Sequence, residues 1–460
     1  MGGRPLPDDA AILPVTAGAS AGTDAGSGAV DGAAPGSGLL AELEWRGILH
    51  ATTPGLAARL ASGRPITGYN GFDPSAESLH VGHLVPIFGL LRLQRAGGRP
   101  IAVVGGGTGM IGDPSGRSAE RNLLDRPTLE RNVGALRSQL ERFLDFTPGS
   151  GGAEMVNNLD WLGEVSLIDF LRDTGKHFTV PYMLAKESVQ ARLDRGLSFT
   201  EFSYMLLQAY DFWHLHRTMG VELQMGGADQ WGNITAGLEL IRRTAGVREE
   251  AAEQPAHGLA YKLLLSASGT KFGKSEEGES VWLDANRTTP FAFYQYWLNA
   301  DDRDVGTYLR WFTEFTRAEV EAMEAESAER PEGRGAQRAL ARDITARTHG
   351  EAAAARAEAD SEALFSGGAI SDPAVLRSLF ESTGGFTFTP DAYASGVAAL
   401  LADSGVVASR GEARRLIAGG GIVINGERAT DPSAVPELIG EEWLDVKIGK
   451  RRREIGRIER

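Results

Sequence analysis

Two short cationic signatures, almost two hundred residues apart, are the residues of this chain best suited to chemistry. His80-Val81-Gly82-His83 follows a strand-like segment, and Lys271-Phe272-Gly273-Lys274-Ser275 lies in a polar, glycine-punctuated segment. The imidazoles stand at a predicted helix start, where Pro86 favours the first turn and the positive end of the helix attracts anions. Together with two ammonium groups from the second signature, they suit a triphosphate that is attacked at its α-phosphorus.

Two other interpretations are open for the histidine pair when its segment is taken alone. A metal site needs a third ligand and usually an i, i+4 spacing on a helix, whereas His80 and His83 are three residues apart. Purely structural histidines are the second alternative. The upstream segment Tyr69–Ser75 favours a ligand site, because its Gly71 lets a ligand approach the backbone closely.

A helix predicted over Glu201–Leu215 carries three polar side chains on one face. Tyr204, Gln208 and Asp211 are spaced i, i+4 and i+7, and the surrounding residues are mostly apolar. Buried polar groups need partners, so these three are expected to converge on a ligand. The alternative is a face that points to solvent.

Two glycine-rich turns add further candidate ligand groups. Gly105–Gly116 lacks the Gly-Lys-Ser/Thr end of a Walker motif, and its Asp113 either accepts a hydrogen bond from a ligand ammonium or is a turn residue. The segment Gln224–Asn233 brings a carboxylate and two amides to a predicted strand end. Its Asp229 could bind ribose hydroxyls, as acidic residues do in dinucleotide-binding folds.

The motifs GFDPSAESLHVGH, GDPSG, SYMLLQAYD, GGADQWGNI and KFGKS, in this order, closely resemble those of bacterial tyrosyl-tRNA synthetases, a family of class I aminoacyl-tRNA synthetases. The resemblance extends from about residue 40 to the end of the chain. It implies that the substrate tyrosine is bound by Tyr69, Asp113, Tyr204, Gln208, Asp211 and Gln230. It implies that ATP is bound by Gly71, Asp73, Gly82, Gly227, Asp229 and Lys274. It implies that the leaving pyrophosphate is stabilised by Ser75, His80, His83, Arg117, Arg121, Lys271, Lys274 and Ser275.

The resemblance also implies a two-step reaction and its partners. Tyrosine attacks ATP, with Mg²⁺ assisting and no dedicated protein site for the metal, and the tyrosyl group then passes to the 3′ end of tRNA(Tyr). A cytoplasmic homodimer is expected. The chain departs from the family pattern at Ser75 and Ser275, where threonine is common, and at Arg117, where lysine is common. These positions keep a hydrogen-bond donor, so the departures bear on rates more than on identity.

Two rival functions are open. A tryptophan-charging enzyme would share both signatures, but tryptophan has no hydroxyl for Tyr69 and Asp211 to bind. A catalytically inactive RNA-binding homologue would be expected to have lost the signatures, yet His80, His83 and both lysines are present.

The elements that must position these residues form an α/β pattern. A strand over Pro65–Tyr69, a helix over Leu84–Arg95 and a strand over Pro100–Val104 predict a doubly wound, mostly parallel, Rossmann-like sheet with ligands at the strand carboxyl ends. The expected organisation is a disordered tail (1–39), a catalytic domain (40–288), a helical domain on the anticodon side (289–365), a linker rich in Gly, Ser, Thr and Pro (366–392) and a small α+β RNA-binding domain (393–460).

The C-terminal region carries a basic cluster in a compact pattern. Ser409 and Glu412 predict a helix start by a capping box, and Asn425-Gly426 predicts a hairpin turn. This helix and hairpin resemble the RNA-binding module of some ribosomal proteins and pseudouridine synthases, although a solvated surface helix is the alternative. The expected tRNA contacts are Arg410, Arg414, Arg415, Lys450, Arg451, Arg452 and Arg453.

Composition limits the remaining possibilities. The net charge is −14, yet residues 447–460 hold seven basic and two acidic side chains, so the charge is polarised along the chain. The absence of cysteine excludes disulfides and a cysteine nucleophile and is typical of a reducing cytosol. No apolar run of the roughly 20 residues that span a bilayer is present, and no secretory signal is expected.

Overall fold

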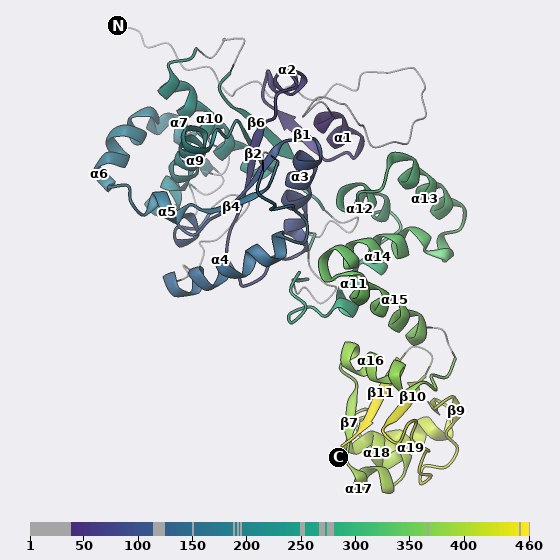
Figure 1. The fold of residues 1–460 in the computed structure, drawn as a ribbon. Coiled ribbons are helices and arrows are strands. Elements are labelled where there is room, and N and C mark those ends of the chain that lie inside the picture. The colour runs from purple at the N-terminus through teal and green to yellow at the C-terminus, as the bar shows by residue number, and fades with distance from the viewer. Residues whose placement is uncertain are drawn as a thin grey trace. The chain divides into compact units, whose positions relative to one another are not determined.

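The computed structural model describes residues 38–113, 125–149, 151–186, 189–190, 193, 196–248, 254–265, 272–273, 280–365, 368–449 and 452–459. Two compact units emerge (Figure 1). The first comprises the chain up to Asp284 together with Asp301–Ala336, and the second comprises Ala285–Ala300 and the chain from Gln337 onward. No helix among the described residues is both long and apolar enough to cross a membrane.

The first unit is built on a six-stranded sheet of order β1-β6-β5-β2-β3-β4. Its strands are β1 (Leu49–Thr52), β2 (Thr67–Phe72), β3 (Arg99–Val104), β4 (Glu154–Asn157), β5 (Leu223–Gly227) and β6 (His257–Tyr261). Only the edge pair of β1 and β6 is antiparallel, which confirms the mostly parallel sheet. The chain runs from β2 to β3 and β4 and resumes on the other side of β2 at β5. The crevice at this reversal is where ligands bind in doubly wound sheets.

Helices lie before β1 and in the segments that connect the strands of this sheet. They are α1 (Leu39–Trp45), α2 (Leu56–Ala61), α3 (Leu84–Arg95), α4 (Arg126–Leu140), α5 (Leu159–Leu162), α6 (Leu167–Asp169), α7 (Val180–Leu184), α9 (Phe199–Met219) and α10 (Trp231–Ala245). Helix α3 has the predicted bounds, and it buries Ile87, Phe88 and Leu91. Helix α9 is longer than predicted, because Ser198 caps it at one end and Gly220 ends it in a left-handed conformation.

Helices α12 (Val305–Phe312) and α13 (Arg317–Glu329) belong to the first unit, which differs from the expected boundary at residue 288. Two buried arginines, Arg46 beyond α1 and Arg92 in α3, explain the difference. They donate hydrogen bonds to the carbonyl groups of Arg310, Trp311, Thr313 and Phe315. The last carbonyls of a helix have no partner within the helix. The hydrogen bonds from Arg46 and Arg92 therefore hold the end of α12 against α1 and α3 of the first unit.

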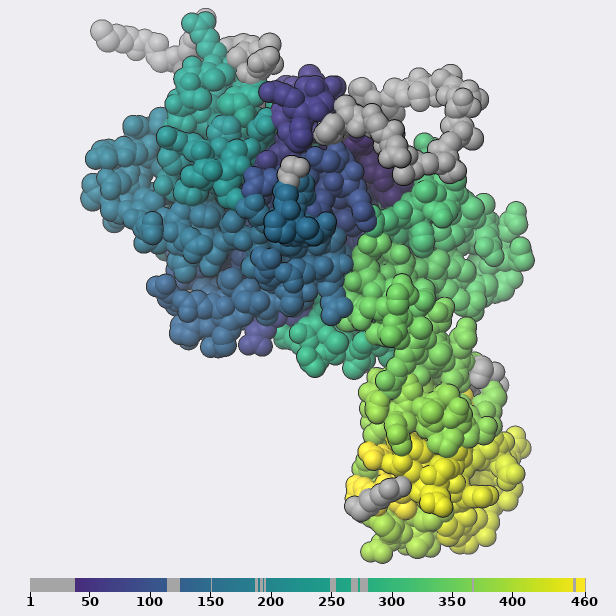
Figure 2. All heavy atoms as spheres, viewed as in Figure 1, coloured from purple at the N-terminus to yellow at the C-terminus, as the bar shows by residue number. Residues whose placement is uncertain are grey.

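The second unit begins with helices and ends with a small sheet. Its helices are α11 (Pro290–Leu298), α14 (Gly335–His349, from Gln337 on), α15 (Glu351–Phe365), α16 (Pro373–Thr383), α17 (Pro390–Ala394), α18 (Val397–Asp403) and α19 (Arg410–Ala418). Its strands are β7 (Phe386–Phe388), β8 (Ile422–Ile424), β9 (Glu427–Arg428), β10 (Trp443–Ile448) and β11 (Arg452–Ile458), in the order β7-β11-β10-β8-β9. In Figure 2 the residues nearest the C-terminus, in yellow, pack against yellow-green residues of the same unit.

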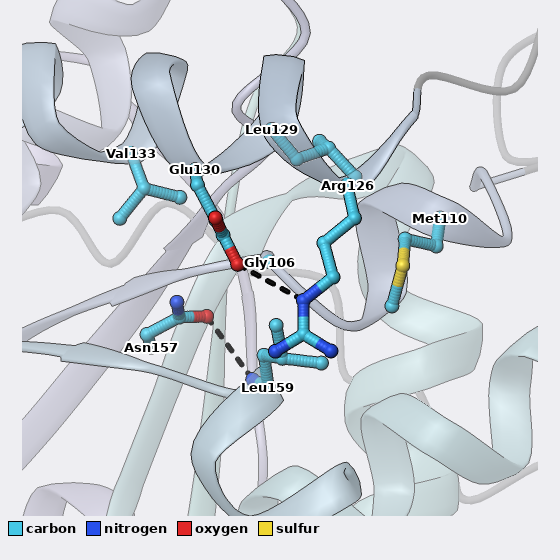
Figure 3. Close-up of a pocket in the computed structure, with 8 residues that line it drawn as sticks. All are labelled: Gly106, Met110, Arg126, Leu129, Glu130, Val133, Asn157 and Leu159. Atoms are coloured by element: carbon cyan, nitrogen blue, oxygen red, sulfur yellow. Dashed lines mark hydrogen bonds and ion pairs between the residues drawn. The ribbon is translucent and has the colours of Figure 1, made fainter.

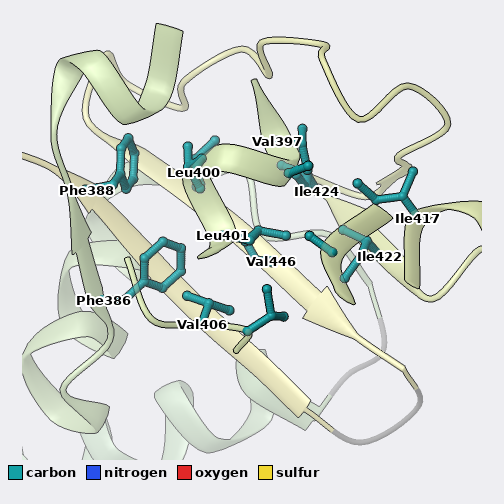
Figure 4. Close-up of a cluster of buried hydrophobic side chains, with 14 residues drawn as sticks. Phe386, Phe388, Val397, Leu400, Leu401, Val406, Ile417, Ile422, Ile424 and Val446 are labelled. Carbon is teal, nitrogen blue, oxygen red and sulfur yellow. The ribbon is translucent and has the colours of Figure 1, made fainter. Parts of the chain in front are cut away.

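The C-terminal module has its own hydrophobic core between one face of this sheet and helices α18 and α19 (Figure 4). Leu400, Leu401, Ile417, Ile422 and Val446 are among its buried members. The predicted hairpin turn is present, with Asn425 and Gly426 both at positive φ. Ser409 caps α19 as predicted, but the Glu412 side chain accepts a hydrogen bond from the Ala408 N–H, so the capping box is incomplete.

The segment 366–392, expected to be a linker, contains α16, β7 and the start of α17. Helix α16 begins at Pro373 after the capping residue Asp372, and it ends at Gly384, which has a left-handed conformation. Its buried residues pack on the outer face of the C-terminal sheet. Pro373, Gly384 and Thr389 of this segment thus begin, end or cap helices of a folded structure.

Candidate active site

Two buried polar side chains, Tyr69 on β2 and Asp211 on α9, form a pair that is called the slot. Asp211 on α9 is 4% exposed and accepts hydrogen bonds from Asn158 Nδ2 (2.9 Å) and Trp161 Nε1 (2.7 Å). Tyr69 on β2 is also buried, its ring packs edge-on against Phe212, and its hydroxyl has no hydrogen-bond partner among the described residues. The slot therefore offers one unused hydroxyl and a carboxylate with further acceptor capacity.

Burial shapes the electrostatics of this slot. It raises the pKa of Asp211 from 3.8 to about 7, even though the hydrogen bonds from Asn158 and Trp161 act in the opposite direction. It also raises the pKa of Tyr69 well above 10, and the nearby charge of Asp211 adds to this effect. The Tyr69 hydroxyl thus keeps its proton and can donate it in a hydrogen bond.

A chain of amides joins the expected ammonium-binding residues. Gln230 Nε2 donates to Asp113 Oδ2 (2.8 Å), and Asn233 Nδ2 donates to both Gln230 Oε1 (3.3 Å) and Gln208 Oε1 (2.9 Å). Tyr204 is buried one turn before Gln208 on the same helix. The structure thus brings Asp113, Gln208 and Gln230 together from three distant segments, and Asn233 connects them.

The two histidines of the first signature are fixed by reciprocal backbone contacts. His80 caps the short helix η1 (Val81–His83), and its Nδ1 accepts a hydrogen bond from the Gly82 N–H (3.1 Å). His83 Nδ1 accepts one from the His80 N–H (3.1 Å). Because each Nδ1 accepts, a neutral ring carries its proton on Nε2. A Cβ atom at position 82 would lie 2.8 Å from the His80 ring, so glycine is required there.

The first signature lies beside the second. The Val81 N–H donates to the Val281 carbonyl (2.9 Å), and the Leu283 N–H donates to the Leu79 carbonyl (2.8 Å). This short antiparallel contact links the histidine signature to the segment that follows the lysine signature. In the lysine signature itself, the Phe272 ring stacks on Phe312 of α12 at a centroid distance of 5.2 Å.

Two tight turns at the strand ends place the expected nucleotide-binding groups. Asp73 follows β2, and its carboxylate lies 3.2 Å from the position of a Cβ added at Gly105, the residue after β3. At the end of β5, the Asp229 carboxylate lies 2.4 Å from the position of a Cβ added at Gly227. A side chain at either glycine would displace the neighbouring carboxylate. Gly71 and Ser75 flank the first turn and are exposed.

Comparison with known proteins identifies the family. Residues 61–366 match the family model described as class I tRNA synthetases (W and Y), and residues 397–435 match the S4 domain. The chain is 52% identical over 422 residues to a tyrosine–tRNA ligase of Roseiflexus castenholzii, covering 90% of this chain and 97% of the relative. The chain belongs to the tyrosyl-tRNA synthetase family. Its identity to the tyrosine–tRNA ligase of Geobacillus stearothermophilus is 50% over 421 residues, with the same coverage of each chain.

Solved structures agree with this membership of the synthetase family. A C-terminally truncated mitochondrial tyrosyl-tRNA synthetase of Coccidioides posadasii matches with a TM-score of 0.61 and 30% identity, over 70% of this chain and 91% of that one. The corresponding enzyme of Aspergillus nidulans matches with a TM-score of 0.63 and 28% identity, over 71% and 94%.

A small, mostly apolar pocket lies next to the synthetase site but does not form part of it (Figure 3). Arg126 and Glu130 of α4 reach toward each other across it and form an ion pair (2.9 Å). Its lining contains none of the expected substrate-binding residues. Its nearest link to the site is Gly106, which follows Gly105 in the turn after β3.

The expected tRNA contacts on the synthetase's C-terminal module divide into two groups. Arg414 and Arg415 are exposed on α19, Arg410 forms an exposed ion pair with Asp403, and Arg452 is half exposed. Arg453 corrects the expectation, because its side chain is only 5% exposed and is paired with the buried Asp445. It is not placed to reach an RNA phosphate.

Several expected residues lie outside the described part of the chain. They are Arg117, Arg121, Lys271, Lys274, Ser275, Lys450 and Arg451. Conversely, the structure adds Asn158 and Trp161, which hold Asp211 from about fifty residues earlier in the chain. No local sequence pattern points to Asn158 or Trp161, whereas Asn233 lies in the motif GGADQWGNI.

Proposed function

We infer that this chain is a tyrosine–tRNA ligase, which activates tyrosine with ATP and transfers the tyrosyl group to tRNA(Tyr). The relatives that cover nearly the whole chain carry this activity in their names. The observation that carries the assignment within the site is the Tyr69 hydroxyl, which has no hydrogen-bond partner among the described residues, near the buried Asp211 carboxylate.

The proposed tyrosine pose places the substrate phenol in this slot. Its hydroxyl donates to Asp211 and accepts from Tyr69. Asn158 and Trp161 each occupy one acceptor position on Asp211, so the carboxylate keeps room for the phenol proton. A site built to bind a hydroxyl rejects an analogue without one, a rule for which tyrosyl-tRNA synthetases are the standard illustration. Phenylalanine and tryptophan lack this hydroxyl, so they would leave the Tyr69 hydroxyl without an acceptor and the remaining acceptor positions of Asp211 unfilled.

The proposed ammonium and carboxylate sites follow from the chain of amides. Asp113, Tyr204 and Gln208 surround the substrate ammonium, and Gln230 lies near the carboxylate. The carboxylate of tyrosine is ionised at neutral pH, so it attacks the α-phosphorus without a general base. The new bond joins a carboxylate oxygen to phosphorus, and the bond to the β,γ-diphosphate breaks.

Proposed phosphate contacts come from both signatures. His80 and His83 stabilise the phosphates, together with Ser75, Arg117, Arg121, Lys271, Lys274 and Ser275. Asp73, Gly227 and Asp229 contact the adenosine, and Gly71, Gly82 and Lys274 are further ATP-binding residues. Such donors stabilise the charge that develops on the leaving pyrophosphate, and one of them is typically worth about 3–4 kcal/mol. Mg²⁺ is proposed to enter as its complex with ATP and would neutralise part of the same charge.

The proposed tRNA contacts are the exposed arginines of the C-terminal module, Arg410, Arg414, Arg415 and Arg452, with Lys450 and Arg451 beside them in sequence. Their charge suits the phosphate backbone, and binding through them should weaken as salt increases. We place the enzyme in the cytoplasm, where its substrates are present and where its lack of cysteine is unremarkable.

The proposed homodimer rests on an apolar surface of the first unit. Leu167, Ile168, Val180 and Phe199 are each more than half exposed, and each lies within three positions in sequence of a member or neighbour of one buried cluster (Phe170, Phe178 and Phe202). Exposed apolar groups of this density favour a partner surface. Phe199→Asp is expected to convert a dimer into monomers in light scattering, because it places a charge where 77% of an aromatic side chain is exposed. Dimers that persist at micromolar concentration would argue against this surface.

Tyrosine-dependent exchange of pyrophosphate into ATP tests the assignment directly. Exchange with tyrosine and not with tryptophan is expected. Exchange with tryptophan alone would support the tryptophan enzyme, and exchange with no amino acid would support the inactive RNA-binding homologue.

A further inference from the structure

The C-terminal strand β11 carries a buried arginine that uses its entire guanidinium group. Arg453 Nε and Nη2 donate to Asp445 Oδ1 (2.7 Å) and Oδ2 (2.5 Å). Its remaining donors reach the carbonyl oxygens of Ala363 (3.0 Å), Leu364 (3.3 Å) and Gly368 (2.9 Å). A guanidinium group has five N–H bonds, so this one is saturated by its own chain.

Two of these carbonyls belong to the last turn of α15. Such groups have no partner within the helix, and the carboxyl end of a helix attracts positive charge. Arg453 lies 90 residues further along the chain than Ala363. It therefore caps α15 from within the C-terminal sheet, through charge-assisted hydrogen bonds.

Asp445 on β10 completes the connection. It is fully buried, and its Oδ2 also accepts a hydrogen bond from the Ile370 N–H (3.2 Å). Because removing one partner of a buried ion pair leaves an uncompensated charge, Asp445 and Arg453 depend on each other. Together they join three segments: the end of α15, the segment just before α16 and the C-terminal hairpin.

Apolar packing follows the same path on the outer face of the sheet. Trp443 and Ile455 alternate with the module's core residues along β10 and β11, and they contact Leu376 and Leu379 of α16. Ala363 and Leu364 of α15 pack against this cluster. The opposite face of the sheet carries the core shown in Figure 4, together with α19 and its exposed arginines. The connection to α15 thus leaves the arginine helix accessible.

We propose that Arg453 and Asp445 are positioning residues for transfer of tyrosine to tRNA: they fix the S4-type module on α15 and so set where Arg414 and Arg415 meet the tRNA. This proposal rests on the proposed function. Neither residue touches RNA. When the first unit has bound one part of the tRNA, a module in a fixed position meets the other part at a high effective concentration. A module that is no longer fixed on α15 meets it at a lower effective concentration.

The test uses the full chain, which has no cysteine to interfere with labelling. Ala355→Cys on α15 and Glu427→Cys on β9, both exposed, carry spin labels for a distance distribution. The variants are Arg453→Met, the double variant Arg453→Met with Asp445→Leu, and Arg453→Lys. The double variant leaves no unpaired buried charge, so the module can fold while the cap on α15 is lost. Arg453→Lys keeps a charge beside Asp445 but cannot reach all three carbonyls.

Arg457→Met is the matched control. Arg457 lies on the same strand and pairs with Glu442 (2.8 Å) within the module, and among the described residues it forms no hydrogen bond with α15. It is expected to keep the distance distribution and the tRNA kinetics of the parent.

We expect a narrow distance distribution in the parent and a broadened one in the double variant. The KM for tRNA should rise about tenfold in the double variant and less in Arg453→Lys, with kcat at saturating tRNA retained. The slope of log affinity against log salt should stay at the parent value in Arg453→Met, whereas Arg414→Met should reduce it by about one.

An equally narrow distribution in the double variant, or a salt slope reduced by about one in Arg453→Met, would overturn the proposal. Failure of the proposed function has a different signature. A parent protein without tyrosine-dependent exchange would refute the function, while the distance distributions would still report on the connection to α15.

Discussion

At the scale of single residues, the fold makes one carboxylate, that of Asp211, costly to ionise, and the proposed selectivity depends on it. Asp211 is buried among Asn158, Trp161 and Tyr69, and burial dominates its raised pKa. The sequence placed Asp211 on a polar helical face with Gln208 and Tyr204. It could not show the donors that hold Asp211, because these come from the segment after β4 and meet α9 only in the folded chain.

Asp211→Asn should lower kcat/KM for tyrosine about 10- to 100-fold, the range expected for a hydrogen bond to a charged group. The preference over phenylalanine should shrink with it. Pyrophosphate exchange with both amino acids measures the effect. Asp360→Asn is the matched control, because Asp360 is equally buried and accepts from Ser378 (2.7 Å) and Ser382 (3.0 Å) in the second unit. A loss of the same size in the control would show that the effect is not specific to the slot.

The raised pKa of Asp211 predicts a pH dependence. The folded protein holds this proton up to about pH 7, whereas the unfolded chain releases it near pH 3.8. The native state therefore binds more protons between these values, and its stability falls as pH rises through this window. Asp211→Asn should flatten this part of the profile of unfolding free energy against pH. Denaturant unfolding at several pH values measures it, and an unchanged profile would contradict the assignment of the pKa.

At the scale of elements, the sequence predicted correctly those helices and strands in which the apolar periodicity and the turn residues at the ends agree. Helix α3 and the parallel strands followed from apolar periodicity and turn residues. The expected linker was wrong for α16, because the Gly, Ser, Thr and Pro content of the segment is typical of a linker although Asp372, Pro373 and Gly384 are helix-capping signals. The attachment of α12 to the first unit depends on Arg46 and Arg92, whose partners lie more than two hundred residues away.

Helix η1 carries the histidines, and one methyl group added to it at Gly82 should slow adenylate formation and lower stability. Gly82→Ala would place a Cβ 2.8 Å from the His80 ring, so the ring or the η1 backbone must move. We expect adenylate formation to slow at least about tenfold and the fold to lose about 1–3 kcal/mol. Single-turnover kinetics and thermal unfolding measure the two effects.

Gly134→Ala provides the control for this substitution. Gly134 lies inside α4 with nothing within 4 Å of an added Cβ, so alanine should be tolerated and raise helix stability by about 0.5–1 kcal/mol. Equal slowing of adenylate formation in Gly82→Ala and Gly134→Ala would contradict the proposal that the position of the His80 ring matters for the reaction.

At the scale of the whole molecule, the chain divides chemistry from RNA recognition. The first unit holds the proposed tyrosine site and the histidine signature, and the second carries the S4-type module with the exposed arginines. The sequence showed the motifs and the basic cluster, since both are local patterns. It placed Arg453 among the RNA contacts because a basic tail has no visible partner until β10 and β11 pair.

Truncation after Phe365 should separate the two activities. It removes α16 and the whole C-terminal sheet, whereas a cut near residue 390 would divide the sheet between β7 and β11. Tyrosine-dependent exchange should persist in the truncated protein, while transfer to tRNA should fall strongly because the arginine contacts are lost. Transfer at the parent rate would show that the module is dispensable.

The most direct measurement of the central claim is pyrophosphate exchange by the full chain with tyrosine, phenylalanine and tryptophan in parallel. We predict saturable exchange with tyrosine and a far lower kcat/KM for the other two, with the preference over phenylalanine reduced in Asp211→Asn. Exchange that is equal for tyrosine and phenylalanine in the parent, or absent with tyrosine, would contradict the claim that Tyr69 and Asp211 select tyrosine for activation.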